Sequence, residues 1–140
     1  MDYYQAKTGK DFQFIASLFK PENTEFMLTK KADYKKMMKS AQAGLTSHFI
    51  ATLEGKKIAW FNLSKSSDLD KVSFGMIVDK SQQGKGYGQE IMKIIEKEAK
   101  NLGVSTIRLA VFEDNIPAVY IYKKAGFKEI GRLINMEKEL

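Results

Sequence analysis

The sequence of 140 residues lacks cysteine and contains only one histidine, two prolines and one tryptophan. Without cysteine, the chain can form neither disulfides nor thiolate metal sites, which suits a reducing compartment. The single histidine, His48, cannot build a histidine-rich metal site, and no spacing around it suggests a serine–histidine triad. We therefore expect no bound metal, and the sequence assigns no role to His48.

Long hydrophobic runs are also absent. No apolar stretch approaches the length of a membrane span, and residues 1–5 lack the apolar centre of a signal peptide. These absences favour a cytoplasmic protein that has no membrane partner.

The composition indicates a folded chain, with 44% hydrophobic, 11% aromatic and 29% charged residues. A chain of this length can bury one substantial core, so we expect a single domain over residues 1–140. The net charge of +6 favours anionic partners, either a nucleic acid or a polyphosphate cofactor. The densest group of lysines lies opposite an apolar stripe, which favours the solvated face of an amphipathic helix over a binding patch. These are Lys30, Lys31, Lys35, Lys36 and Lys39.

Hydrophobic periodicity predicts an α/β domain. Thr8 and Asp11 resemble a capping box at the start of the first helix, and Pro21 and Asn23 break that helix. Gly75, inside a predicted strand, suggests a bulge or a close backbone neighbour, with a mere packing gap as the alternative. A strand, helix and strand after residue 72 make a right-handed crossover between parallel neighbours the expected connection. The expected strands are 3–6, 48–53, 57–63, 72–78 and 105–112, with one or two more between 127 and 139, and the later helices are 31–43, 89–102 and 115–126.

The rest of the chain is organised around a glycine-rich stretch between the strand that ends at Val78 and the following helix. It contains Gln83-x-x-Gly86-x-Gly88, which is neither a Walker loop nor a dinucleotide fingerprint. Glycines let the backbone approach a ligand closely, and the first amides of the helix are left free for an anion. A diphosphate is the expected ligand, whereas a flexible glycine hairpin without a ligand is the alternative.

A second motif lies in the last quarter of the chain. Asn115 is a candidate N-cap, Pro117 is tolerated in a first helical turn, and Gly126 stands where a left-handed C-cap is needed. The two motifs together resemble those of the GNAT family of N-acetyltransferases. The first matches its acetyl-CoA signature, and the second matches Asn-x-x-Ala-x-x-x-Tyr-x-x-x-Gly-Phe at Asn115, Ala118, Tyr122, Gly126 and Phe127.

The resemblance implies a mixed, largely antiparallel central sheet with a V-shaped splay between two parallel strands, flanked by about four helices. It implies acetyl-CoA as co-substrate, with its pantetheine arm in the splay beside Ile77 and Val78 and its diphosphate on the amides of residues 83–88. Asn115 would hold the arm, and Lys80 replaces the proline common in the family. The cofactor residues implied are Ile77, Val78, Gln83, Gly84, Lys85, Gly86, Tyr87, Gly88, Asn115, Ala118, Tyr122 and Lys124.

The implied reaction is direct transfer of the acetyl group to a primary amine of a small molecule or peptide. Tyr122 would act as general acid because a phenol stays protonated at neutral pH, and the amide of Val78 would stabilise the oxyanion. The alternative for Tyr122 is a packed aromatic residue; Tyr120 would face elsewhere on the helix. The base stays open between Glu113, Glu25 and a chain of water molecules.

The acceptor pocket and the partners are also left open by the sequence. Trp60 and Phe61 are candidates to line the acceptor pocket, although one of them is expected in the core. The rival functions are an acetyl-CoA sensor without catalysis and a basic nucleic-acid-binding domain, of which the second has only the net charge in its favour. Dimers are common in the family, but nothing in this chain requires one.

Overall fold

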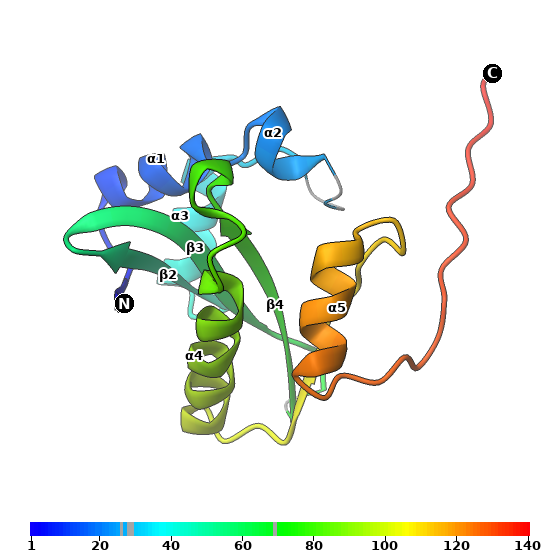
Figure 1. Cartoon of the computed structure of the whole chain (residues 1–140). Helices are drawn as coiled ribbons and strands as arrows, with labels where there is room; N and C mark the ends of the chain where they lie inside the picture. Colours follow the sequence, from blue (N-terminus) through cyan, green and yellow to red (C-terminus); the bar gives the residue numbers. More distant parts are fainter. Residues whose placement is uncertain (26, 28–29, 69) are drawn as a thin grey trace.

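A five-stranded sheet in the order β1-β2-β3-β4-β5 forms the centre of the fold (Figure 1). We describe it from a computed structural model that covers residues 1–25, 27, 30–68 and 70–140. The first four strands are antiparallel neighbours, and β4 and β5 are parallel. The predicted mixed, largely antiparallel sheet is therefore confirmed. The strands are β1 (Asp2–Gln5), β2 (Thr46–Leu53), β3 (Lys56–Lys65), β4 (Lys71–Val78) and β5 (Thr106–Arg108).

The parallel strands β4 and β5 pair over only three residues each. Lys71–Ser73 is in register with Thr106–Arg108, and beyond these residues the two chains part. β4 continues for five more residues along β3, whereas the segment after Arg108 leaves the sheet. The sequence predicted a strand from 105 to 112, but the strand ends early because its partner no longer runs beside it. This is the splay that the motifs led us to expect.

Five α-helices and one 3₁₀-helix flank the sheet in the described part of the chain, against about four expected helices. Thr8 and Asp11 form the predicted capping box at the start of α1. Pro21 begins a further short helix as well as following the end of α1, because its fixed φ suits a first helical position. The helices are α1 (Gly9–Ser17), α2 (Pro21–Thr24), α3 (Tyr34–Gln42), η1 (Lys80–Gln82), α4 (Tyr87–Asn101) and α5 (Ile116–Lys124).

The two faces of the sheet bury separate cores. On one face, α4 packs Ile91, Met92 and Ile95 onto the sheet, and Phe61 stacks on Phe49 with ring centroids 4.9 Å apart. On the opposite face, α1 packs Phe12 and Ile15 against a second group from three strands. That group is Ile50, Trp60 and Ile77. Each face of the sheet is therefore covered by different helices. Because both faces are buried, the register of the central strands is fixed.

Gly75 lies opposite Asn62 in a regular stretch of the β3–β4 ladder, so the bulge considered from the sequence is not there. The register shift in the sheet lies instead between Ala51 and Thr52. A Cβ at position 75 would stand 3.1 Å from the Trp60 ring and 3.2 Å from Asn62 Oδ1. The glycine is thus explained by a close neighbour, although that neighbour consists of side chains rather than backbone.

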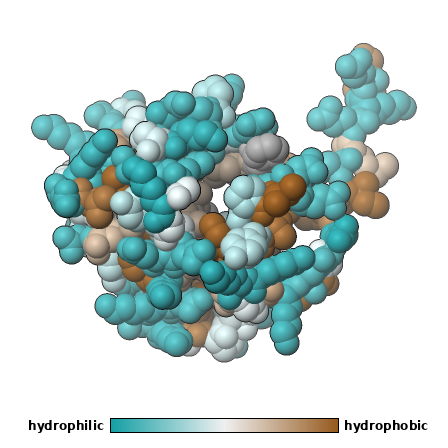
Figure 2. Space-filling model, in the orientation of Figure 1, coloured by the Kyte–Doolittle hydropathy of each residue, from teal (hydrophilic) through white to brown (hydrophobic). Residues whose placement is uncertain are grey.

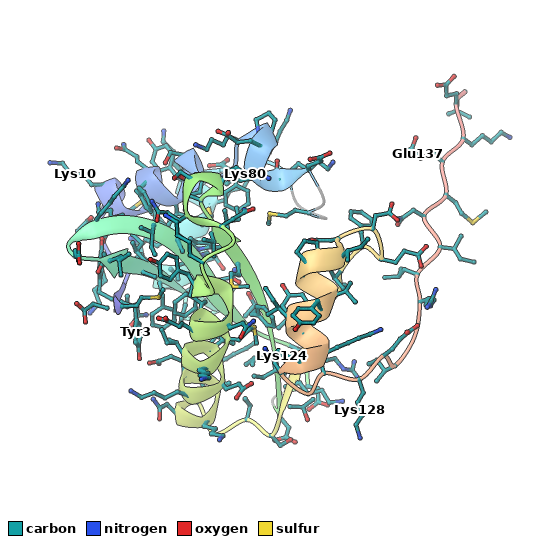
Figure 3. All side chains as sticks on the ribbon, viewed as in Figure 1. Tyr3, Lys10, Lys80, Lys124, Lys128 and Glu137 are labelled. Atoms are coloured by element: carbon teal, nitrogen blue, oxygen red, sulfur yellow. The ribbon has the colours of Figure 1, made fainter. Side chains whose placement is uncertain are left out.

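The segment after α5 was predicted to supply one or two strands, which is wrong for this structure. Residues 128–140 are exposed and pair with no strand, and Figure 1 shows them leading away from the sheet. Glu137, labelled in Figure 3, lies far out on this segment. Near the start of this C-terminal segment, Arg132 forms ion pairs with Glu129 and Glu113. Among the helices of the described residues, none has the length and apolar character needed to cross a membrane.

Candidate functional site

The glycine-rich stretch forms a loop between β4 and α4. Gly84 and Gly86 have φ of +77° and +85°, which side chains rarely adopt, and Gly86 is the N-cap of α4. The amides of residues 84–86 donate to no other group in the described part of the chain, and residues 87–89 stand in the first helical turn. The Gln83 amide was predicted to be free for the diphosphate, but it donates to the Lys80 carbonyl at 3.3 Å. The loop therefore offers a run of free amides that begins at Gly84.

Alternate residues of β4 turn their backbone groups toward the gap beside β5. The Asp79 amide donates to the Ile58 carbonyl at 3.0 Å, and Ile77 is in register with Trp60. Because hydrogen-bonded pairs alternate along an antiparallel ladder, Ile77 and Asp79 face β3. The backbone groups of Val78, and likewise of Met76, face the gap. Met76 thus offers the free groups that the sequence assigned to Ile77.

The side chain of Gln83 reaches back to the end of β4. Its Nε2 donates to the Val78 carbonyl at 2.9 Å, which leaves the Val78 amide as the free group at this point. The glutamine of the signature thus joins the loop to the end of the strand. At residue 78 the amide remains as the group that points into the gap.

Helix α5 borders the gap on its far side. Tyr122 packs edge-to-face on Phe74, with ring centroids 5.6 Å apart, and also contacts Phe127. Burial raises the pKa of Tyr122 to about 12, so the phenol keeps its proton at neutral pH. Asn115 is the N-cap of α5 as predicted, but its side chain makes no capping hydrogen bond. That amide is left available to a ligand.

These elements enclose one continuous cavity of about 1490 Å³. It runs from the glycine-rich loop through the gap between β4 and α5 to the sheet face beneath α2 and α3. Figure 2 shows the hollow between the main body and α5, with hydrophobic side chains at its edge. Of the residues predicted for the site, those lining the cavity are Ile77, Val78, Gln83, Gly84, Gly86, Tyr87, Gly88, Asn115, Ala118 and Tyr122.

Three predicted site residues do not line the cavity. Lys85 Nζ lies 3.4 Å from Gln82 Oε1, and Lys124 Nζ lies over the Tyr120 ring. Glu113 is exposed and forms an ion pair with Arg132 at 3.0 Å. Its role as a base therefore has no support from this geometry, whereas Glu25 does line the cavity. The roles of all of these residues stay predictions.

The far end of the cavity is built by residues that the sequence left unassigned. Trp60 lines it as one of the two aromatic candidates, whereas Phe61 is fully buried on the α4 face. The Trp60 Nε1 donates to His48 Nδ1 at 3.0 Å, and His48 is only 3% exposed. Asn62, next to Trp60 on the same strand face, also lines the cavity. The polar residues at alternate positions of β2 and β3, facing a predicted helix, were the signal available in the sequence.

Asn23 of α2 joins the far end of the cavity to the glycine-rich loop. Its side chain donates to the Leu18 carbonyl at 2.9 Å and to Asp79 Oδ1 at 3.2 Å, and accepts from the Lys80 amide at 2.9 Å. Burial opposes ionisation of Asp79, but hydrogen bonds from Ser81, Asn23 and Lys20 outweigh it and hold the pKa below its ordinary value. Figure 3 shows Lys80 beside α2 at the start of the loop.

Comparisons with known proteins support one family. The model of the acetyltransferase (GNAT) family matches residues 12–127. The Bacillus subtilis spermine/spermidine N(1)-acetyltransferase is 38% identical over 63 residues, which are 44% of this chain and 41% of that protein. The Escherichia coli L-amino acid N-acetyltransferase AaaT is 39% identical over 59 residues, covering 41% and 36%. The matched part thus spans less than half the length of these relatives.

A solved structure from Clostridium acetobutylicum, described as a predicted acetyltransferase with acetyl-CoA, has the same fold. Its TM-score is 0.73 at 18% identity, and the match covers 97% of this chain and 95% of that one. At this identity, the likeness concerns the fold alone.

Replacing Asn23 with alanine should lower the free energy of unfolding by about 2 kcal/mol, because it removes two partly buried hydrogen bonds and one exposed one, and such bonds each contribute about 0.5–1.5 kcal/mol. Urea unfolding followed by circular dichroism measures the change. Ser81→Ala is the matched control, since it removes one exposed bond to the same Asp79 carboxylate without touching α2. Equal losses in the two variants would contradict a special role for Asn23.

His48 should make folding depend on pH. Burial lowers its pKa from 6.5 to about 4, so between these values the unfolded chain binds more protons than the folded one. Its contribution to stability is complete above pH 6.5 and is lost as the pH falls toward 4, on the order of 2 kcal/mol after allowance for partial solvation.

Unfolding measured from pH 4.5 to 7.5 tests this expectation against His48→Gln, which has no titrating ring. As the pH falls, the unfolding free energy of wild type should decrease relative to that of His48→Gln. Parallel curves for the two proteins would show that the ring does not titrate differently on folding.

Proposed function

Because the chain belongs to the acetyltransferase (GNAT) family, we propose that it transfers an acetyl group from acetyl-CoA to a primary amine in a ternary complex. The observation that carries this proposal is the parting of β4 and β5 beside a loop of free amides. Release of CoA thiol, measured with acetyl-CoA across a panel of amines, tests it. No release with any amine, together with intact binding of acetyl-CoA, would favour a sensor over an enzyme.

The loop fits the diphosphate of CoA. Free amides at the start of a helix, with the positive end of its dipole, favour an anion. Gly88 also matters, because a Cβ there would lie 3.3 Å from Ile121 Cδ1, so glycine lets α4 and α5 approach each other. The amides of residues 84–88 would hold the diphosphate, and the exposed lysines around the loop add a favourable field.

The gap beside β4 fits an extended arm with amide groups. Free backbone groups of Met76 and Val78 can pair with it as a neighbouring strand would, and the Asn115 amide on the opposite wall can hold it in place. The amide of Val78 would donate to the thioester oxygen as it becomes negative, which typically lowers a barrier by about 3 kcal/mol. Bound in this way, acetyl-CoA supplies the activated acetyl group.

Transfer requires a neutral amine to attack the thioester carbonyl, after which the sulfur leaves as a thiolate. Tyr122 would donate its proton to the sulfur. Burial makes the phenol a weaker acid than in water, so it is fully protonated when needed, and its contacts with Phe74 and Phe127 fix its ring. Glu25 is the remaining carboxylate candidate to accept the proton from the amine, either directly or through water.

The size of the cavity supports two substrates bound together. Ligand pockets typically measure about 300–1,000 Å³, whereas this open cavity measures about 1490 Å³. The named relatives act on spermine or spermidine and on amino acids, so the acceptor differs among members of the family. An amine acceptor that enters beneath α2 and α3 is consistent with this arrangement.

Replacing Tyr122 with phenylalanine should lower kcat by about ten- to a thousandfold with little change in the affinity for acetyl-CoA, because only the proton donor is lost. Steady-state kinetics and calorimetry measure the two effects. Tyr120→Phe is the control, since Tyr120 lies on the same helix and also borders the cavity but is 60% exposed and does not contact Phe74 or Phe127 in the described pairs of aromatic rings. An unchanged kcat for Tyr122→Phe would remove the general-acid role.

Replacing Gly86 with valine should weaken acetyl-CoA binding at least about tenfold, because the side chain strains a left-handed N-cap and crowds the anion site. Gly103→Val is the matched control: Gly103 has φ of +77° with equally open surroundings but lies at the other end of α4. Both variants should lose stability, and only Gly86→Val should lose binding in calorimetry. Unchanged binding would falsify the assignment of the loop.

A further inference from the structure

The sheet face beneath α3 changes from apolar to polar inside the cavity. Ile50 and Ile77 pack on α1, but His48, two residues before Ile50 on β2, is a polar residue of which only 3% is exposed. Because the Trp60 Nε1 donates to His48 Nδ1, a neutral imidazole carries its proton on Nε2. The low pKa produced by burial keeps the ring neutral at physiological pH. His48 thus presents one hydrogen-bond donor.

That donor opens into the cavity. Within the described ranges, no group accepts a hydrogen bond from His48 Nε2. Yet none of the fully buried side-chain nitrogen or oxygen atoms described here is left without a partner. Nε2 is therefore not sealed in the core. Since His48 lines the cavity, the donor is available to a molecule bound there.

The groups next to His48 are uncharged. Asn62 accepts a hydrogen bond from the Gly75 amide through Oδ1, which leaves its own NH₂ group to donate. Thr46 shares hydrogen bonds of 3.3 Å with Ser64 and Ser40, and all three line the cavity. This end of the cavity therefore offers several neutral donors and hydroxyls on a fixed frame.

The charges around the acceptor end do not select for a strongly charged molecule. The described residues that line the cavity include three acidic side chains and three lysines but no arginine. Asp33 is already used to cap α3, and Glu22 pairs with Lys20 at 3.0 Å. A polyamine would require a net negative surface, and a buried carboxylate would require a fixed cationic partner. Among the described residues at the polar end of the cavity beside His48, there is neither a net negative surface nor a fixed cationic group.

We propose that His48 determines acceptor specificity by donating a hydrogen bond from Nε2 to an uncharged oxygen of the amine substrate. The acceptor is then a small primary amine that bears hydroxyl or amide carbonyl groups, rather than a polyamine or a free amino acid. This inference rests on the proposed acetyl transfer. A site built to hydrogen-bond an oxygen discriminates strongly against analogues that lack it, because its buried donors are left unpaired.

The kinetic test compares wild type, His48→Leu and His48→Gln with five amines. Glucosamine offers hydroxyls, alaninamide offers an amide carbonyl, and cyclohexylamine offers neither; alanine and spermidine test a carboxylate and a polycation. Because the amines differ in their own basicity, the readout is the ratio of variant to wild-type kcat/KM for each amine. This ratio cancels the fraction of neutral amine.

His48→Leu should lower kcat/KM about tenfold or more for the oxygen-bearing acceptor, through KM, and by less than about threefold for cyclohexylamine. His48→Gln retains a donor and should recover most of the loss. Whether glucosamine or alaninamide shows the effect identifies the source of the oxygen. An equal loss for all amines would mean a structural role only, and wild-type transfer confined to spermidine or alanine would overturn the acceptor class.

A binding test with a readout other than activity uses the fact that His48 is the only histidine in the chain. In protein labelled with ¹⁵N-histidine and saturated with CoA, the Nε2 resonance should shift on addition of glucosamine or alaninamide and not of cyclohexylamine. Absence of any shift overturns the inference while CoA binding and transfer remain. Absence of CoA binding and of transfer to every amine overturns the proposed function itself.

Discussion

The site depends on one aromatic cluster at the point where the parallel strands part. Phe74 follows directly on the last residue of β4 that pairs with β5, and it contacts both Tyr122 and Phe127. These contacts join α5, and Phe127 just after its end, to β4. They hold the helix beside the gap, so the opening in the sheet is set by packing and does not require a ligand to hold it apart. Buried aromatic pairs of this kind each add about 0.5–1.5 kcal/mol beyond the area they bury.

A second constraint ties the two ends of the cavity to each other. The short α2 is too small to hold its own position, yet Asn23 bonds it to the end of α1, the end of β4 and the start of η1. Lys20 adds an ion pair to Asp79 at 3.2 Å. The glycine-rich loop and α2 are therefore joined by direct side-chain contacts rather than through a chain of intermediate residues.

The fold was largely predictable from the sequence because it depends on local signals, whereas the cofactor residues came from the resemblance to the family and stay predictions. Glycines at fixed spacing, a capping asparagine and alternating strands each specify a conformation within a few residues. What failed depends on partners distant in sequence. The strand expected at 105–112 stops at Arg108 because the chain leaves the sheet there while β4 continues along β3, and the backbone of Ile77 faces β3 because of a register that no single strand reveals.

The acceptor side could not be predicted for the same reason. His48 was left without a role, since a lone histidine in a strand is meaningful only once Trp60 is found across the ladder and α3 above it. Asn23 looked like a helix breaker, and its bonds reach 56 residues along the chain to Asp79. Glu113 followed a predicted strand whose residues 109–111 do line the cavity, but its own side chain is exposed and pairs with Arg132. In each case the sequence contains both residues but does not reveal that they lie next to each other in the fold.

The two faces of the sheet divide stability from specificity. The α4 face is apolar throughout, with Phe61, Val72, Ile91 and Ile95 fully buried, and substitutions there would be expected to unfold the chain before they altered a ligand. The opposite face is apolar only beneath α1 and becomes polar toward Asn62 and Ser64. Asn62 and Ser64 at that end bond to Gly75 and Thr46 and, among the described residues, to none of the free amides of the loop. The proposed acceptor site can therefore change by substitution on one half of one sheet face while the groups proposed to hold acetyl-CoA stay in place.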